Sequence, residues 1–125
     1  GHDDSIGDLA FSPDGTRLAS VSNDRQLIVW DVASGQSLWA QVAHQNRATA
    51  VTFHPRMPTI ATVGVDAVVR FWSTRDQVAE DSVRLVGEHP LDVGVCDAIA
   101  FSEDGRSLFV RHSARGVTEV KTAPD

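Results

Sequence analysis

The chain has 125 residues, of which 42% are hydrophobic and 22% charged, and its formal net charge is −6 at pH 7. This acidic balance argues against nucleic-acid and anionic-membrane binding, and no apolar run approaches the ~18 residues of a membrane-spanning helix. The single cysteine excludes an intrachain disulfide and, with no recognisable leader, predicts a reducing, cytoplasmic location without membrane contact.

The first third of the chain is typical of four short strands joined by turns. Pro13-Asp14-Gly15 combines a fixed φ, a side-chain acceptor and a flexible backbone, which favours a tight turn. Asn23-Asp24 and Ser34-Gly35 predict two further turns. Between the turns, apolar and polar residues alternate or branched and aromatic residues cluster, as in strands. The expected strands are residues 6–11, 18–22, 27–30 and 37–42.

The same order recurs twice, because Phe11, Phe53 and Phe101 lie 42 and then 48 residues apart and each precedes a turn. A period of about 40–45 residues is that of a four-stranded propeller blade. The second unit predicts strands at 48–53, 59–63, 68–72 and 82–86, and the third at 96–101, 107–111 and 117–121. Only residues 122–125 remain, so the third unit lacks a fourth strand. We expect units at 1–43, 44–86 and 87–125.

Four features resemble the signature of a WD-repeat β-propeller: Gly1-His2, Ser20, Asp24 and Trp30-Asp31. The resemblance covers essentially the whole chain. It implies an all-β fold of antiparallel four-stranded blades, with about 2.75 blades in these residues.

In this family a histidine, a hydroxyl residue, a turn aspartate and a tryptophan form a buried hydrogen-bonded tetrad. The resemblance implies His2, Ser20, Asp24 and Trp30 in the first unit and His44, Thr62, Asp66 and Trp72 in the second. The spacing agrees in both, with 22 residues from histidine to aspartate and 6 from aspartate to tryptophan. In the third unit Ala114 and Val120 stand at the aspartate and tryptophan positions, so no such tetrad is expected there.

The same residue types also build hydrolase triads, but Ser20 falls inside a strand and the chain has no Gly-x-Ser-x-Gly elbow. His2-Asp3-Asp4 lacks a second histidine or cysteine at ligand spacing, so no metal site is expected. His54 and His112 have no partner visible in the sequence, and Cys96 is predicted to be a small buried hydrophobe. The glycines form no phosphate loop. We expect no catalytic residue, metal or cofactor.

Partner contacts in WD-repeat propellers cluster at the outer end of each first strand and just before the turn aspartate. Carried over by position, the resemblance implies Ser5, Gly7 and Asn23 in the first unit, Arg47, Thr49 and Val65 in the second, and Val95, Asp97 and Ser113 in the third. Arg47 is the strongest candidate, because arginine is enriched at interface hot spots.

The predicted function is that of a non-enzymatic protein–protein interaction scaffold, formed by a segment of a larger WD-repeat propeller. Its expected partners are another protein and either the remaining blades of the same propeller or other copies of the chain. One alternative is a sensor or regulatory module of a bacterial signalling protein, such as a kinase or NTPase. A small-ligand-binding propeller is the weaker alternative, since no convergent cluster of carboxylates or histidines falls on the inner strands.

Overall fold

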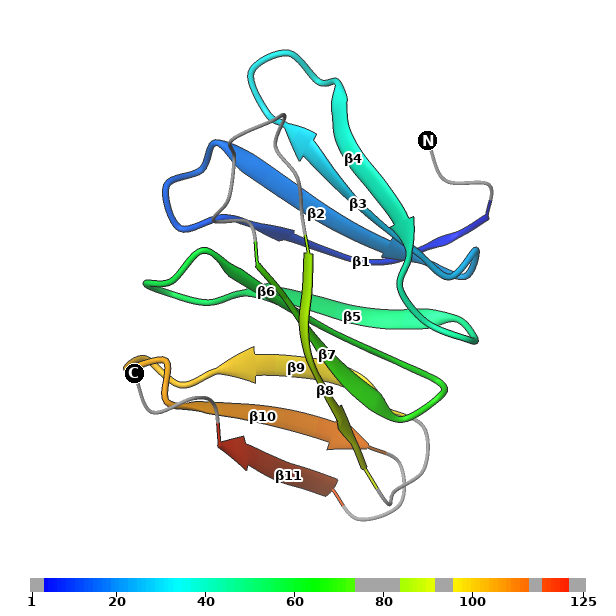
Figure 1. Cartoon of the computed structure of the whole chain (residues 1–125), viewed down its shortest axis with the longest axis vertical. Coiled ribbons are helices and arrows are strands. Elements are labelled where there is room, and N and C mark those ends of the chain that lie inside the picture. Colours follow the sequence, from blue (N-terminus) through cyan, green and yellow to red (C-terminus); the bar gives the residue numbers. More distant parts are fainter. Residues whose placement is uncertain (1–3, 74–83, 92–95, 113–115, 122–125) are drawn as a thin grey trace.

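The computed structural model describes residues 4–73, 84–91, 96–112 and 116–121 (Figure 1). They form three antiparallel sheets, which we call blades 1, 2 and 3, with strand orders β1-β2-β3-β4, β5-β6-β7-β8 and β9-β10-β11. The all-β prediction of blade-like antiparallel sheets is confirmed. In this part of the chain no helix has the length and hydrophobicity needed to cross a bilayer.

The strands follow one another along the chain through tight turns. Their bounds are β1 Ile6–Phe11, β2 Arg17–Ser22, β3 Gln26–Asp31, β4 Ser37–Val42, β5 Ala48–Phe53, β6 Thr59–Gly64, β7 Val68–Ser73, β8 Arg84–Pro90, β9 Cys96–Phe101, β10 Ser107–His112 and β11 Gly116–Lys121. Most lie within a residue of the bounds expected from the sequence.

The largest difference lies in β8, expected at 82–86 and found at Arg84–Pro90. This strand pairs with β7 along its whole length, from Ser73 opposite Arg84 to Val68 opposite Pro90. The ladder ends at Pro90, which has no N–H to donate. The expected boundary between residues 86 and 87 therefore falls inside a strand of blade 2.

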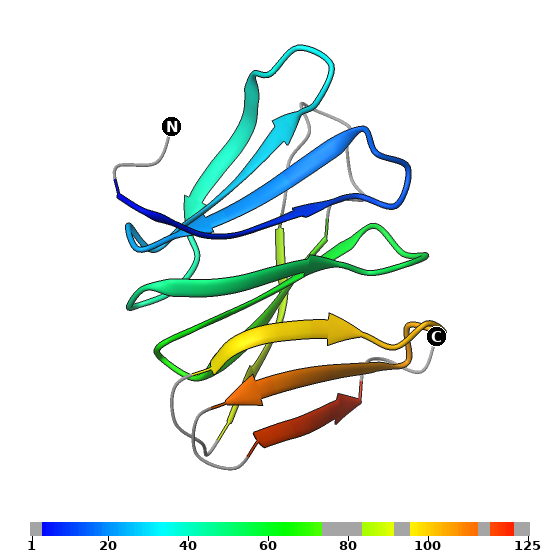
Figure 2. The same cartoon turned by 180° about the vertical axis from the view of Figure 1, so that it is seen from behind.

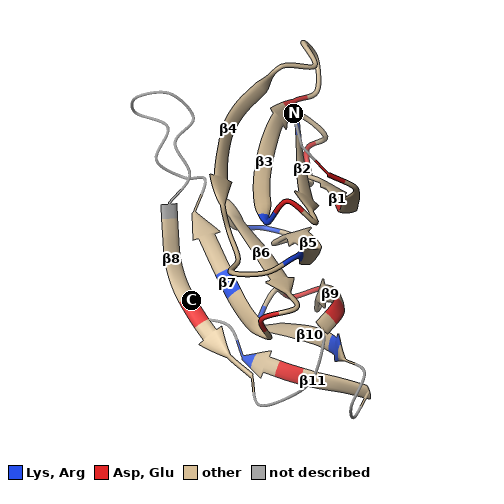
Figure 3. Cartoon of the chain, turned by 90° about the vertical axis from the view of Figure 1, so that its right-hand side faces the viewer, with Lys and Arg blue, Asp and Glu red and all other residues tan. Residues whose placement is uncertain are grey.

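The three blades stack with their first strands β1, β5 and β9 side by side along one edge, and β4, β8 and β11 along the other (Figure 3). Seen from behind, β1, β5 and β9 lie in front (Figure 2). We call the rim that contains the amino-terminal ends of these inner strands and the turns at 23–25 and 65–67 the N-rim. The opposite rim, with the loops at 12–16, 54–58 and 102–106, is the C-rim.

Two hydrophobic clusters lie between the blades, because alternate strand residues point to opposite faces of a sheet. Between blades 1 and 2, Val21 and Leu27 pack in one cluster with Ile60 and Trp72. Trp39 of β4 adds an edge-to-face contact with Trp72, with ring centroids 5.8 Å apart. The second cluster contains Ala61, Val63 and Val69 of blade 2 with Leu108, Val110 and Val120 of blade 3.

Matching tetrapeptides build matching turns on the C-rim. Gly15 has φ 77° and donates its N–H to the Ser12 carbonyl at 2.9 Å, and Gly105 repeats this with Ser102. A side chain is strained at such φ values, so glycine is required. The Thr16 amide, followed by the hydroxyls of Ser12 and Thr16, lowers the pKa of Asp14 to about 2.

Candidate functional site

The centre of blade 2 holds a buried chain of hydrogen bonds. Trp72 Nε1 donates to Thr62 Oγ1 at 3.0 Å, and the same oxygen lies 2.9 Å from His44 Nε2. Nδ1 of the ring lies 3.0 Å from a carboxylate oxygen of Asp66. The structure thus brings together His44, Thr62, Asp66 and Trp72, called here the His44 tetrad, and ties β6 and β7 to the two loops of the N-rim.

The donors and acceptors of the His44 tetrad define its protonation. A carboxylate only accepts, so Nδ1 carries the proton and donates it to Asp66, while Nε2 accepts from the Thr62 hydroxyl. Burial lowers the pKa of His44, and the cationic Arg70 adds to this shift, against the attraction of Asp66. Burial alone would raise the pKa of Asp66, but the His44 ring, Arg70 and the Gln45 amide together lower it. A neutral imidazole beside an ionised carboxylate results.

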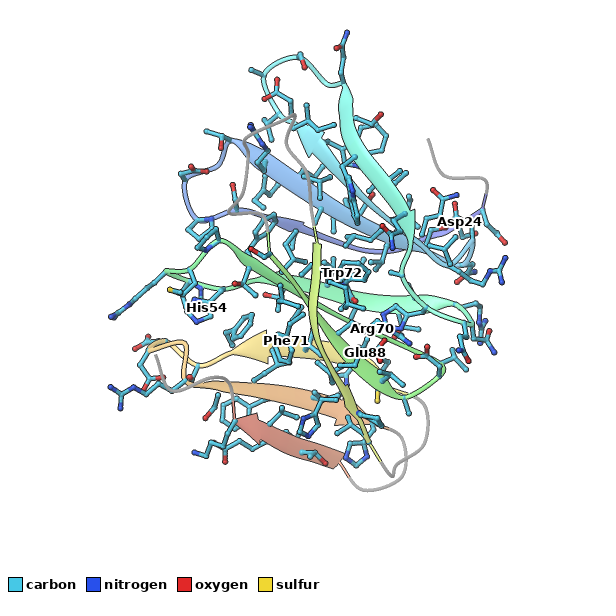
Figure 4. All side chains as sticks on the ribbon, in the orientation of Figure 1. Asp24, His54, Arg70, Phe71, Trp72 and Glu88 are labelled. Carbon is cyan, nitrogen blue, oxygen red and sulfur yellow. The ribbon has the colours of Figure 1, made fainter. Side chains whose placement is uncertain are left out.

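Arg70 and Glu88 extend this network, and the sequence analysis missed both (Figure 4). Arg70 Nη1 lies 3.0 Å from Asp66 Oδ2 and 2.8 Å from His44 Nδ1, so the ring and the guanidinium share one carboxylate. Arg70 Nε donates to Glu88 on β8 at 2.9 Å. A charge inside the apolar run of β7 was the available signal, because buried charges are nearly always paired.

In blade 1 the structure brings Ser20 and Trp30 together, with Nε1 donating to the buried Ser20 Oγ at 2.9 Å. Asp24 accepts the Gln26 amide at 2.9 Å and so supports the β2–β3 turn. His2 lies outside the described residues, so the tetrad of blade 1 stays a prediction. Ser20 is buried and receives the indole N–H, which is unlike an exposed nucleophile.

Blade 3 uses a different histidine. His112 at the end of β10 is buried, with Nε2 at 2.7 Å from Thr118 Oγ1, while Val120 is buried at the tryptophan position and Ala114 lies outside the described residues. In the sheet ladders His112 pairs with Cys96 as Gly64 pairs with Ala48.

Space at the equivalent position of blade 2 explains this exchange. A Cβ added at Gly64 would lie 3.1 Å from Cγ of His44. The β6 position therefore projects into the volume that a loop histidine fills in blade 2, and in blade 3 the strand supplies the histidine itself. The sequence analysis had left His112 without a role.

His54 also has partners that the sequence did not indicate. Its Nδ1 accepts the backbone N–H groups of Arg56 and Met57 at 3.0 and 2.9 Å, which leaves the proton on Nε2. Nε2 donates to the carbonyl of Gly105 at 2.9 Å, and the ring lies 4.8 Å from that of Phe101. His54 therefore connects blade 2 to blade 3 at the C-rim.

The expected partner-contact residues form a row along the N-rim. Asn23 N–H donates to the Ser5 carbonyl at 3.0 Å, and Val65 N–H donates to the Arg47 carbonyl at 2.9 Å. A Cβ at Gly7 would lie 2.7 Å from the Ala48 carbonyl oxygen, which joins blade 1 to blade 2.

The row continues into blade 3, because the Thr49 hydroxyl donates to the carbonyl of Cys96, next to Asp97. Asp97 pairs with Arg111 at 2.9 Å. Ser5, Gly7, Arg47 and Asp97 are exposed, and Asn23, Thr49 and Val65 are half-buried. Val95 and Ser113 lie outside the described residues. The described residues contain no group of three metal-ligating side chains.

Repeated four-stranded sheets with tryptophan–hydroxyl hydrogen bonds define a propeller-type repeat protein. The family model "WD domain, G-beta repeat" matches residues 1–31 and 35–73. The chain therefore belongs to the WD-repeat family.

Several curated proteins are similar to the chain. A subunit of chromatin assembly factor 1 from Gallus gallus is 29% identical over 112 residues, which cover 89% of this chain and 20% of that protein. Human WD repeat-containing protein 90 is 32% identical over 81% of the chain and 5% of its own length. A subunit of eukaryotic translation initiation factor 3 from Neurospora crassa is 29% identical over 95% of the chain and 31% of its own length. The chain thus spans less than a third of each.

Proposed function

We propose that this chain is a segment of a larger WD-repeat propeller and that its N-rim binds a protein partner. The observation that carries the proposal is the continuous row from Gly7 through Thr49 to Asp97, which crosses all three blades. Propeller rims of this family typically serve as non-enzymatic scaffolds. Two relatives are named as subunits of larger factors, which supports an interaction role. We keep a cytoplasmic location as part of the proposal.

An open blade face supports the view that further blades, or other copies of the chain, cover blade 1. Leu9 and Phe11 are 55% and 63% exposed, on the face turned away from blade 2. Their counterparts 42 residues later, Val51 and Phe53, pack in the cluster between blades 1 and 2. A face that is buried when a blade precedes it is thus left exposed on blade 1, and such a face marks an interaction surface.

The test is a pull-down with the full-length protein that carries this chain. Arg47→Ala removes the exposed guanidinium from the N-rim, and Arg56→Ala removes one from the C-rim. We expect a partner that the wild type and Arg56→Ala retain and that Arg47→Ala loses. Retention by Arg47→Ala with loss by Arg56→Ala would show that the wrong rim was chosen.

A further inference from the structure

Two exposed arginines on the N-rim have no side-chain partner among the described residues, Arg25 and Arg47. Three other arginines of the described chain are paired: Arg17 with Asp31, Arg70 with Asp66 and Glu88, and Arg111 with Asp97. Because the chain as a whole is acidic, an uncompensated pair of cations on one rim is a departure from its average surface.

Hydrogen bonds hold the two arginines on neighbouring segments. The Arg25 carbonyl accepts the N–H groups of Ala43 and His44 at 2.8 and 3.3 Å. The segment that continues to Arg47 therefore crosses directly at the β2–β3 turn. Arg47 is anchored in turn, since its own carbonyl receives the Val65 N–H. Both backbones are rigidly placed while both guanidinium groups reach solvent.

The nearby carboxylates are already occupied by the fold. Asp24 accepts the Gln26 amide, and Asp66 is shared by His44, Arg70 and the Gln45 amide. Asp4 at the same rim accepts the Ser5 amide. Carboxylates for Arg25 and Arg47 must therefore come from outside these residues.

The backbone at Arg25 is a second, independent observation. Its φ is 75°, in the left-handed region, which is disfavoured for a residue with a side chain. Strained positions of this kind concentrate at binding sites. Glycine would adopt this conformation without strain, so a side chain here comes at a cost to stability.

We propose that Arg25 and Arg47 bind glutamate or aspartate side chains of an acidic, extended segment in the partner protein. The inference rests on the proposed function of the N-rim and specifies the chemistry of its partner. Guanidinium groups form charge-assisted hydrogen bonds with carboxylates, and the half-buried Val65 beside Arg47 offers an apolar contact to the intervening residues.

The experiment measures binding of a fluorescent synthetic peptide of alternating glutamate and serine to the full-length protein. An extended peptide presents all its glutamates on one side. The comparison peptide carries glutamine in place of glutamate. We expect the glutamate peptide to bind about fivefold or more tightly than the glutamine peptide at low salt, and the difference to shrink as salt is raised.

Two variants separate this proposal from general electrostatics and from misfolding. The double variant Arg25→Glu/Arg47→Glu should abolish the preference for glutamate, whereas Arg56→Glu/Arg106→Glu, with the same change of net charge on the C-rim, should keep it. Arg25→Gly should weaken binding without lowering the unfolding temperature, because it relieves the left-handed φ. A merely structural Arg25 would not produce that combination.

The failures are distinguishable. Equal or undetectable binding of the two peptides, or tighter binding of a single-stranded oligonucleotide, overturns the acidic-segment proposal. If Arg47→Ala nevertheless loses the partner in the pull-down, the N-rim function stands and only its chemistry is wrong. If Arg47→Ala keeps the partner, the proposed function itself fails.

Discussion

His54 Nε2 and the carbonyl oxygen of Gly105 lie 2.9 Å apart and join blade 2 to blade 3 across the C-rim. The contact depends on glycine, because a Cβ at residue 105 would lie 2.2 Å from Cε1 of the ring. The two residues therefore form one unit, in which the ring occupies the space that the missing side chain leaves.

The first prediction concerns this contact. His54→Ala should lower the free energy of unfolding by about 1–2 kcal/mol, through the lost hydrogen bond and the lost ring contact with Phe101. Gly105→Ala should cost at least as much, since it adds both strain and a clash. Thermal unfolding of both single variants and the double variant checks this. Additive effects would contradict direct coupling, because the double variant no longer contains the clash.

The second prediction concerns Asp66. Asp66→Ala should destabilise the chain by about 1–3 kcal/mol, because it leaves the buried His44 N–H without an acceptor and Arg70 with Glu88 alone. Asp24→Ala tests the corresponding turn of blade 1 in the same range. Chemical denaturation provides the measurement, with Asp4→Ala at the exposed N-rim as control. Unchanged midpoints for both turn aspartates would refute a structural role for them.

The third prediction concerns pH. The pKa of His44 is lower in the folded chain than its unfolded value of about 6.5, so the unfolded state binds the proton first on acidification. Stability should therefore be fully present at neutral pH and fall as the pH drops below about 6.5. The low pKa of Asp66 adds a further loss at more acidic pH, below about 4.

His44→Gln should remove the His44 part of this dependence. The unfolding temperature of the variant should fall less than that of the wild type between pH 7 and pH 5. Equal slopes in the two proteins would mean that His44 titrates alike in the folded and unfolded states.

Much of the fold could be predicted because its signals are local. Turn residues such as Asp14-Gly15 and strict alternation along β2 specify strand, turn and face within a few residues. The end of β8 could not be, because its length depends on pairing with β7. Arg70 and His112 were missed for a related reason: their partners Glu88 and Thr118 become neighbours only once the sheets have formed.

The fourth prediction tests the exchange of histidines in blade 3. His112→Ala should destabilise the chain by about 2–3 kcal/mol, since it opens a cavity and leaves the Thr118 hydroxyl without its partner. Thr118→Val, which keeps the shape and removes the hydroxyl, should cost about 1 kcal/mol. His89→Ala on the exposed face of β8 is the control. If His112→Ala and His89→Ala unfold at the same temperature, the buried histidine has no structural role.

The last prediction concerns the open face of blade 1. Because Phe11 is 63% exposed while its counterpart Phe53 packs in a cluster, the isolated 125-residue chain should self-associate through this face. Phe11→Glu places a charge there and should shift the chain toward a monomer of 13.5 kDa in analytical ultracentrifugation. Val32→Glu makes the same charge change at the β3–β4 loop and should leave association unchanged. A wild-type chain that is already monomeric, with a cooperative melt, would show that this face needs no neighbouring blade.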